Sequence, residues 1–145
     1  MTNYSDLLKQ NNLKSTFQRV NILEVIDKNG HMSVDGIYNE VASVHPSLSL
    51  ATIYKNIIMM LDKNILVEVP ILGQKSKYEI IKKNHIHLVC ENCAEVYDKP
   101  YALEADKILS ELASQAHFTL SKQQINLYGV CESCQHNELS VRIEA

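Results

Sequence analysis

The first part of the chain carries apolar residues at helical spacing, separated by short polar segments. Four helices are predicted: residues 4–11, residues 16–28, a third that begins after Ser33 and ends at His45-Pro46, and a fourth that begins after Ser49. Both serines can accept hydrogen bonds from the backbone of the first turn that follows them. The predicted apolar face of the fourth helix comprises Leu50, Ile53, Ile57, Ile58 and Leu61.

After the fourth predicted helix, apolar residues recur at every second position instead of at helical spacing. Val67, Val69 and Ile71 alternate with other residues, Leu72-Gly73 favours a turn, and residues 77–81 can return as a second strand. Helices followed by a two-stranded ribbon are typical of the winged form of the helix-turn-helix. The first domain is therefore expected to span residues 1–82.

The second half of the chain mixes strands with one helix. Strands are predicted over residues 86–90, 95–98 and 124–130, and Ala102 to Ala116 forms an amphipathic helix. The apolar side of this helix carries Ala105, Ile108, Leu109, Leu112 and Ala116. A domain of residues 83–145 is too small to bury both this stripe and its strand edges, so we expect it to self-associate as a homodimer. The fold class is α+β.

All four cysteines of the chain occur as two Cys-x-x-Cys pairs, Cys90/Cys93 and Cys131/Cys134. Two such pairs brought together form a closed tetrahedral zinc site, which is structural rather than catalytic. The alternative is a pair of disulfides or a redox motif. That alternative is disfavoured because the first residues lack the basic flank and apolar run of a signal peptide. We therefore expect a cytoplasmic protein with structural Zn(II).

The net charge of −3 does not by itself indicate a nucleic-acid partner. Residues 1–82 carry nine basic and eight acidic side chains, whereas residues 83–145 carry five and nine. The acidity thus lies in the second half. Any DNA binding by the first half requires a focused surface rather than an overall positive charge. No apolar run is long enough to span a bilayer, so no membrane association is expected.

Polar and basic residues gather at the start of the fourth predicted helix, as expected of a helix that enters the major groove. Another group opens the second helix and can hold phosphates, which position a protein without reading sequence. Both groups are equally compatible with ordinary solvated helix faces. The candidate DNA-binding residues are Lys14, Gln18, Arg19, Thr52, Tyr54, Lys55 and Asn56.

Four segments together resemble the ferric uptake regulator (Fur) family of metal-dependent transcription factors. They are Thr16-Phe-Gln-Arg19, Ser49-Leu-Ala-Thr-Ile-Tyr-Lys55, His85-Ile-His-Leu-Val-Cys-Glu-Asn-Cys93 and Tyr128-Gly-Val-Cys-Glu-Ser-Cys134, and the likeness covers nearly the whole chain. The resemblance implies an N-terminal winged helix that binds double-stranded operator DNA and a C-terminal α/β dimerisation domain. It also implies a regulatory metal between the two domains.

The resemblance also implies which side chains hold that metal: His31, Glu79, His85, His87 and Asp98. His85 and His87 alternate on a predicted strand, so their imidazoles are expected to face the same way. Three histidines and two carboxylates without a thiolate suit Fe(II), Mn(II) or Zn(II). Zinc-sensing relatives often use a cysteine here, and all four cysteines are already assigned, which favours Fe(II) or Mn(II).

The resemblance leaves two sensing functions open. Asp98 is the residue typical of the peroxide-stress (PerR-like) branch, whereas Glu79 is more typical of iron sensors. We give Asp98 the greater weight and predict a repressor that senses peroxide through Fe(II)-catalysed oxidation of ligand histidines. The alternatives are an iron-availability sensor and a zinc-stapled interaction module without DNA. A zinc hydrolase is disfavoured because four thiolates leave no open position on the metal, so the protein is not expected to be an enzyme.

Overall fold

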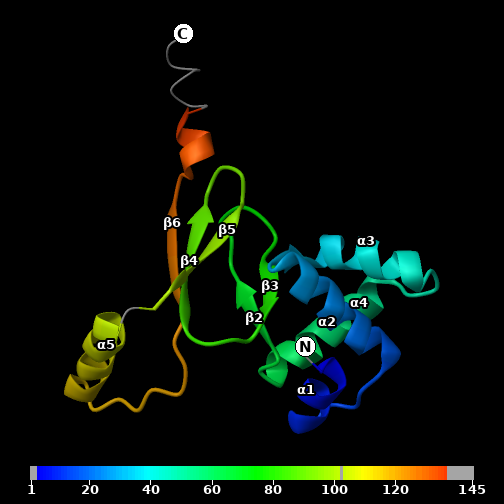
Figure 1. The fold of residues 1–145 in the computed structure, drawn as a ribbon, viewed down its shortest axis with the longest axis horizontal. Coiled ribbons are helices and arrows are strands. Elements are labelled where there is room, and N and C mark those ends of the chain that lie inside the picture. Colours follow the sequence, from blue (N-terminus) through cyan, green and yellow to red (C-terminus); the bar gives the residue numbers. More distant parts are fainter. Residues whose placement is uncertain (1–2, 102, 137–145) are drawn as a thin grey trace. The chain divides into compact units, whose positions relative to one another are not determined.

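The computed structural model describes residues 3–101 and 103–136. The chain divides into two compact units, Met1–Lys82 and Lys83–Ala145. The helices of the first unit and the strands of the second are labelled along the ribbon in Figure 1.

The first unit contains four helices and three short strands. Its elements are α1 (Tyr4–Gln10), α2 (Phe17–Asn29), β1 (Met32–Ser33), α3 (Val34–Val44), α4 (Leu50–Asp62), β2 (Leu66–Val69) and β3 (Lys77–Ile80). Each helix begins after a residue whose side chain accepts a hydrogen bond from the first turn: Asn3, Thr16, Ser33 and Ser49. The four helices predicted from spacing are confirmed, with ends shifted by one residue at most.

The strands of the first unit form an antiparallel sheet in the order β1-β3-β2. The two-residue β1 was not predicted, because so short a strand leaves no period in the sequence; it pairs Met32 with Tyr78. Strand β2 ends at Val69, so Ile71 does not continue it as expected. The N–H of Gln74 bonds to the carbonyl of Ile71 at 3.2 Å, which closes the turn of the wing, and Gly73 takes a φ of 73° that suits glycine.

A single apolar core joins the helices to the sheet. Ile22, Leu23 and Ile26 of α2 and Ile37 and Val41 of α3 are fully buried. On α4 the buried side chains are Ile53, Ile57 and Met60, which lie at i, i+4 and i+7. Leu50 and Ile58 were expected on this face but are 41% and 44% exposed. Both are apolar, so composition alone could not show that the buried stripe passes beside them.

The second unit contains a three-stranded sheet and helix α5, and residues 132–136 are also helical. Its elements are β4 (His85–Cys90), β5 (Val96–Pro100), α5 (Leu103–Gln115) and β6 (Ile125–Gly129), and the strand order is β5-β4-β6. Strands β4 and β5 are antiparallel, whereas β4 and β6 are parallel because the chain crosses over through α5. The predicted strands and helix are present; Ala102, the predicted first residue of the helix, lies outside the described residues.

Helix α5 lies apart from the three strands of its own unit in Figure 1. It has no buried residue, and its stripe includes Ile108, 64% exposed, and Leu112, 65% exposed. The predicted amphipathic pattern is therefore real, but nothing within the described chain covers it. Among the described helices, none has both the length and the apolar character needed to cross a membrane.

Candidate metal centres and nucleic-acid interface

The parallel pairing of β4 with β6 brings the two Cys-x-x-Cys pairs to the same end of the sheet. Cys90 is the last residue of β4 and pairs with Gly129, two residues before Cys131. The Sγ atoms of Cys90, Cys93, Cys131 and Cys134 all lie within 4.8 Å of one another. The turn between Cys90 and Cys93 is completed by Ala94, whose φ is 65° and whose N–H bonds to the Cys90 carbonyl at 3.0 Å.

The donor set of this cluster fits zinc. The Sγ atoms of Cys93 and Cys131 are 3.8 Å apart, and a tetrahedron with Zn–S bonds of about 2.3 Å has an edge of about 3.8 Å. The four cysteines are free thiols, so the disulfide alternative is not what the fold forms. The backbone N–H groups of Cys93 and Cys131 point at Cys90 Sγ and lower the pKa of that thiol to about 6, which favours the thiolate that a metal binds.

Two of the predicted regulatory ligands meet within the first unit. His31 follows α2, and Glu79 lies on β3, beside the strand that His31 precedes. The His31 Nε2 atom is 2.8 Å from Glu79 Oε2, and Glu79 is only 1% exposed. A carboxylate so deeply buried requires cationic or hydrogen-bonding partners, and both the His31 imidazole and Lys82 Nζ, 3.9 Å from the same oxygen, lie beside it.

The other three predicted ligands meet within the second unit. Asp98, His87 and Asn126 form one row across the sheet, because His87 pairs with Asp98 on β5 and with Asn126 on β6. The Nε2 atoms of His85 and His87 are 2.8 Å apart, and Asp98 Oδ1 lies 3.4 Å from the first and 3.5 Å from the second.

The protonation of both imidazoles is set by the opposite ring nitrogen. His85 Nδ1 lies 2.8 Å from the carbonyl oxygen of Lys83, and His87 Nδ1 lies 2.9 Å from Asn126 Oδ1. Both oxygens only accept hydrogen bonds, so each Nδ1 is the donor of its pair. In a neutral ring, Nε2 is then the nitrogen whose lone pair is available to a cation. Two lone pairs and one carboxylate oxygen then face one point, the arrangement that a divalent cation requires. Sequence reasoning missed Asn126, because a lone asparagine inside a predicted strand has no pattern.

The predicted DNA-binding residues form two groups on the first unit. On α4, the side chains of Thr52, Tyr54 and Lys55 are exposed and that of Asn56 is half-buried. The first turns of α2 and α4 contain no acidic residue, whereas those of α1, α3 and α5 each contain at least one. Helix N-termini without acidic residues are compatible with phosphate.

The second group lies at the start of α2. Gln18 and Arg19 are on its first turn, but Lys14 does not open the helix as expected. Lys14 precedes the N-cap Thr16 and lies in the loop, because the threonine side chain fixes the helix start by accepting from the N–H of Arg19 at 3.2 Å. The side chain of Lys14 remains exposed.

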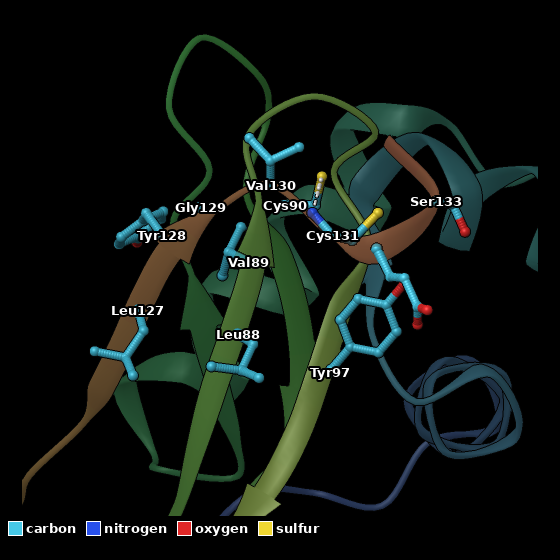
Figure 2. A pocket seen from close by; sticks show the side chains of 11 residues that line it. Leu88, Val89, Cys90, Tyr97, Leu127, Tyr128, Gly129, Val130, Cys131 and Ser133 are labelled. Atoms are coloured by element: carbon cyan, nitrogen blue, oxygen red, sulfur yellow. Dashed lines mark hydrogen bonds between the residues drawn. The ribbon is translucent and has the colours of Figure 1, made fainter. Parts of the chain in front are cut away.

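Beside the cysteines, the sheet of the second unit carries a cavity of about 410 Å³. Figure 2 shows Leu88, Val89, Leu127 and Tyr97 on the strands around it, with Cys90 and Cys131 at its upper end. The lining is mainly apolar, and Leu127 is 52% exposed. Within the described part of the chain, apolar side chains on this face of the sheet thus remain exposed.

Comparison with known proteins identifies the family. The ferric uptake regulator family model matches residues 10–128. The peroxide-responsive repressor PerR of Staphylococcus saprophyticus is 30% identical over 129 residues, covering 88% of this chain and 86% of that protein. The solved structure of the Campylobacter jejuni peroxide stress regulator is 29% identical with a TM-score of 0.75, covering 92% of this chain and all of that one.

A second solved structure is equally similar in sequence. The Vibrio cholerae ferric uptake regulator (Fur) is 29% identical with a TM-score of 0.73, and the match covers 89% of this chain and 100% of that one. The matches to both kinds of regulator extend over both units. The chain therefore belongs to the ferric uptake regulator family of metal-responsive, DNA-binding transcriptional regulators, which are not enzymes.

Proposed function

We propose that this protein is a homodimeric repressor that binds operator DNA while metal-loaded and releases it when peroxide oxidises a ligand histidine. In this proposal the structural zinc is held by Cys90, Cys93, Cys131 and Cys134, and the regulatory metal by His31, Glu79, His85, His87 and Asp98. The protein acts in the cytoplasm, where four free thiols can remain available to zinc.

The observation that carries the proposal is the set of three acceptors in the second unit. His85 Nε2, His87 Nε2 and Asp98 Oδ1 lie within 3.5 Å of one another. Acceptor atoms this close to one another are favourable only around a cation or a shared proton, so the geometry supports metal binding. The first unit supplies a second His–carboxylate pair, His31 with Glu79. One metal that engages both sets would fix the orientation of the DNA-binding unit, which is how metal loading controls DNA binding.

The donor chemistry favours Fe(II) or Mn(II). Three imidazoles and two carboxylates contain no soft thiolate, and the cysteines are gathered in their own cluster. When bound, Fe(II) would supply the electron that cleaves the O–O bond of hydrogen peroxide and would regain an electron from the oxidised ring, so that the histidine supplies both electrons overall. The protein's part is to hold ligand imidazoles beside that reaction. One oxygen atom of the peroxide is added to the ring carbon between the nitrogens of His31 or His85, and the other leaves as water. The 2-oxo ring no longer donates the same nitrogen.

The peroxide function rests on Asp98 and on the peroxide regulators among the relatives. The second candidate, an iron-availability sensor, is favoured by Glu79 and by the equally identical Vibrio cholerae structure. The two functions share the same ligands and the same DNA surface. They differ only in whether the iron-loaded protein reacts with peroxide.

Exposed side chains support the proposed DNA surface and the proposed dimer interface. Helix α4 presents Thr52, Tyr54 and Lys55 to solvent, as a helix that reads the major groove must. In the second unit the exposed stripe of α5 and the cavity on the sheet offer apolar surface that a second copy can cover.

A gel shift with metal-loaded protein tests both the function and the sensing chemistry. Mn(II)- and Fe(II)-loaded protein should both retard operator duplex, and a chelator should abolish binding. A brief, low dose of peroxide should release DNA from the iron form only, with one added oxygen on a peptide that contains His31 or His85. If the iron form keeps its DNA and neither peptide is oxidised, the protein is an iron-availability sensor. If no metal supports DNA binding, the repressor function itself is wrong.

A further inference from the structure

Arg19 occupies an unfavourable place in the first unit. It lies in the first turn of α2, where the aligned peptide dipoles repel a cation, and no acidic residue in that turn offsets this effect. Its side chain is half-buried rather than extended into solvent. The position therefore requires specific partners for the guanidinium.

Three groups hold the guanidinium of Arg19. Its Nε donates to Asn56 Oδ1 at 3.0 Å, its Nη1 donates to the carbonyl oxygen of Lys14 at 2.7 Å, and its Nη2 lies 3.5 Å from Met59 Sδ. Asn56 and Met59 belong to α4, whereas Lys14 lies in the loop before α2. The planar fork of arginine thus ties the start of α2 to one side of α4.

The contact continues along α4 from Asn56. The Asn56 Nδ2 atom donates to the carbonyl of Thr52 at 3.0 Å, and the Thr52 hydroxyl lies 2.9 Å from the hydroxyl of Ser49, which caps the helix. A side-chain amide reads adenine through both of its ends. Both ends of Asn56 are already engaged within the protein, so its amide is fixed by Arg19 rather than free to search for a base.

We propose that Arg19 is a positioning residue for DNA recognition, which holds α4 through Asn56 and does not itself bind phosphate. This inference rests on the proposed DNA-binding function and replaces the phosphate role that the sequence predicted for Arg19. Direct contacts are then left to the exposed side chains: Tyr54 and Lys55 on α4, and Lys14 before α2. The network sets the direction in which α4 presents them.

The two roles of Arg19 predict different effects of conservative substitution. A phosphate contact needs a positive charge, which lysine supplies. A positioning role needs the three donors of a planar guanidinium in fixed directions, and the ammonium of lysine cannot reproduce that geometry. Loss of a phosphate contact also lowers the salt dependence of binding, because fewer counterions are released. Loss of positioning leaves the number of neutralised phosphates unchanged.

The experiment measures the affinity of full-length, zinc- and Mn(II)-loaded protein for two duplexes over a range of salt. One duplex is an operator selected from random sequences by the wild-type protein, and the other is an unrelated duplex. Arg19→Ala and Arg19→Lys should each weaken operator binding about tenfold while changing unrelated DNA by less than about twofold. Their salt slopes should equal that of wild type.

Two further comparisons separate positioning from other roles. Arg19→Ala combined with Asn56→Ala should bind the operator no more weakly than Arg19→Ala alone, because both act through one contact. Lys14→Ala is the matched control, since it keeps the backbone carbonyl that Arg19 uses; its salt slope should fall by about 0.9.

The inference is overturned if Arg19→Lys binds the operator as wild type does, or if Arg19→Ala lowers the salt slope as Lys14→Ala does. It is also overturned if both duplexes lose affinity equally alongside a lower unfolding midpoint, since that result shows a purely structural residue. If the wild-type protein binds no duplex in a metal-dependent way, the proposed function fails and the inference falls with it.

Discussion

The two units of this protein bury their apolar residues in different ways. In the first unit, side chains from every helix and from the sheet close around one core, and Leu8, Ile22, Ile53 and Ile57 have no exposed surface. In the second unit the described buried residues are Val89, Cys90, Ala94, Cys134 and the polar His87, while α5 buries none. The first unit is stabilised by its own core, whereas the second depends on what it binds.

That difference assigns separate tasks to the two units. A small domain with little core is stabilised by a metal or by association. In the second unit, four thiols at one end of the sheet can bind the metal, and exposed apolar surface can support association. The first unit can therefore remain folded while the second unit is stabilised by metal and by association.

The largest expected effect comes from the cysteine cluster. Cys93→Ser should lose the tightly bound zinc, unfold the second unit and abolish the dimer, because structural zinc contributes folding free energy directly. Elemental analysis, sizing and circular dichroism measure the three effects, and the helical content of the first unit should persist. Ser133→Ala, between the second pair of cysteines, is the matched control. A zinc-free variant that stays a stable dimer would contradict this account of the second unit.

The next effect concerns the exposed stripe of α5. Leu112→Glu should shift the protein towards monomer and weaken operator binding, because it places a charge on the surface that we propose a second copy covers. Sedimentation at several protein concentrations measures the change. Ser110→Glu puts the same charge on the opposite side of the helix and should leave the dimer intact. Equal behaviour of the two variants would show that the stripe is not the interface.

A smaller effect is expected at Asn126, which contacts His87 but is not one of the proposed metal ligands. Asn126→Ala should lower the affinity for Mn(II) by about 10- to 100-fold, because His87 loses the acceptor that keeps its Nε2 lone pair directed at the metal. Asn126→Asp retains an acceptor oxygen and should retain most of the affinity. Mn(II) titration of DNA binding measures both. If Asn126→Ala and Asn126→Asp lower the Mn(II) affinity equally, the acceptor oxygen at position 126 does not orient His87.

How much of this could be predicted from the sequence also differs between the units. Helix starts at Thr16, Ser33 and Ser49 follow from local chemistry, and the structure confirms them. The cysteine spacing likewise predicted one four-thiol cluster. The role of Asn126 and the partners of Arg19 could not be predicted, because each depends on contacts between residues 37 or more positions apart. The exposure of Ile58 was not predicted either, because helical spacing does not determine which of two adjacent apolar residues is buried.

The smallest expected effect lies on the surface of the self-contained first unit. The Tyr4 hydroxyl donates to Asp27 Oδ2 at 2.5 Å and ties α1 to α2, and this bond, together with burial and the carboxylate charge, raises the pKa of Tyr4 to about 12. A raised pKa means that the stabilisation is present below the usual tyrosine value near 10 and is lost as pH rises towards 12. Because the bond is exposed, Tyr4→Phe should lower the free energy of unfolding by only about 0.5–1 kcal/mol at neutral pH.

Denaturant unfolding of Tyr4→Phe, followed by circular dichroism, measures that loss. The difference from wild type should shrink as the pH is raised from 10 to 12. DNA binding and dimerisation should be unchanged, because the core of the first unit does not depend on this bond. A loss of several kcal/mol would instead mean that α1 is essential to the core, and that the first unit is less self-sufficient than its buried residues indicate.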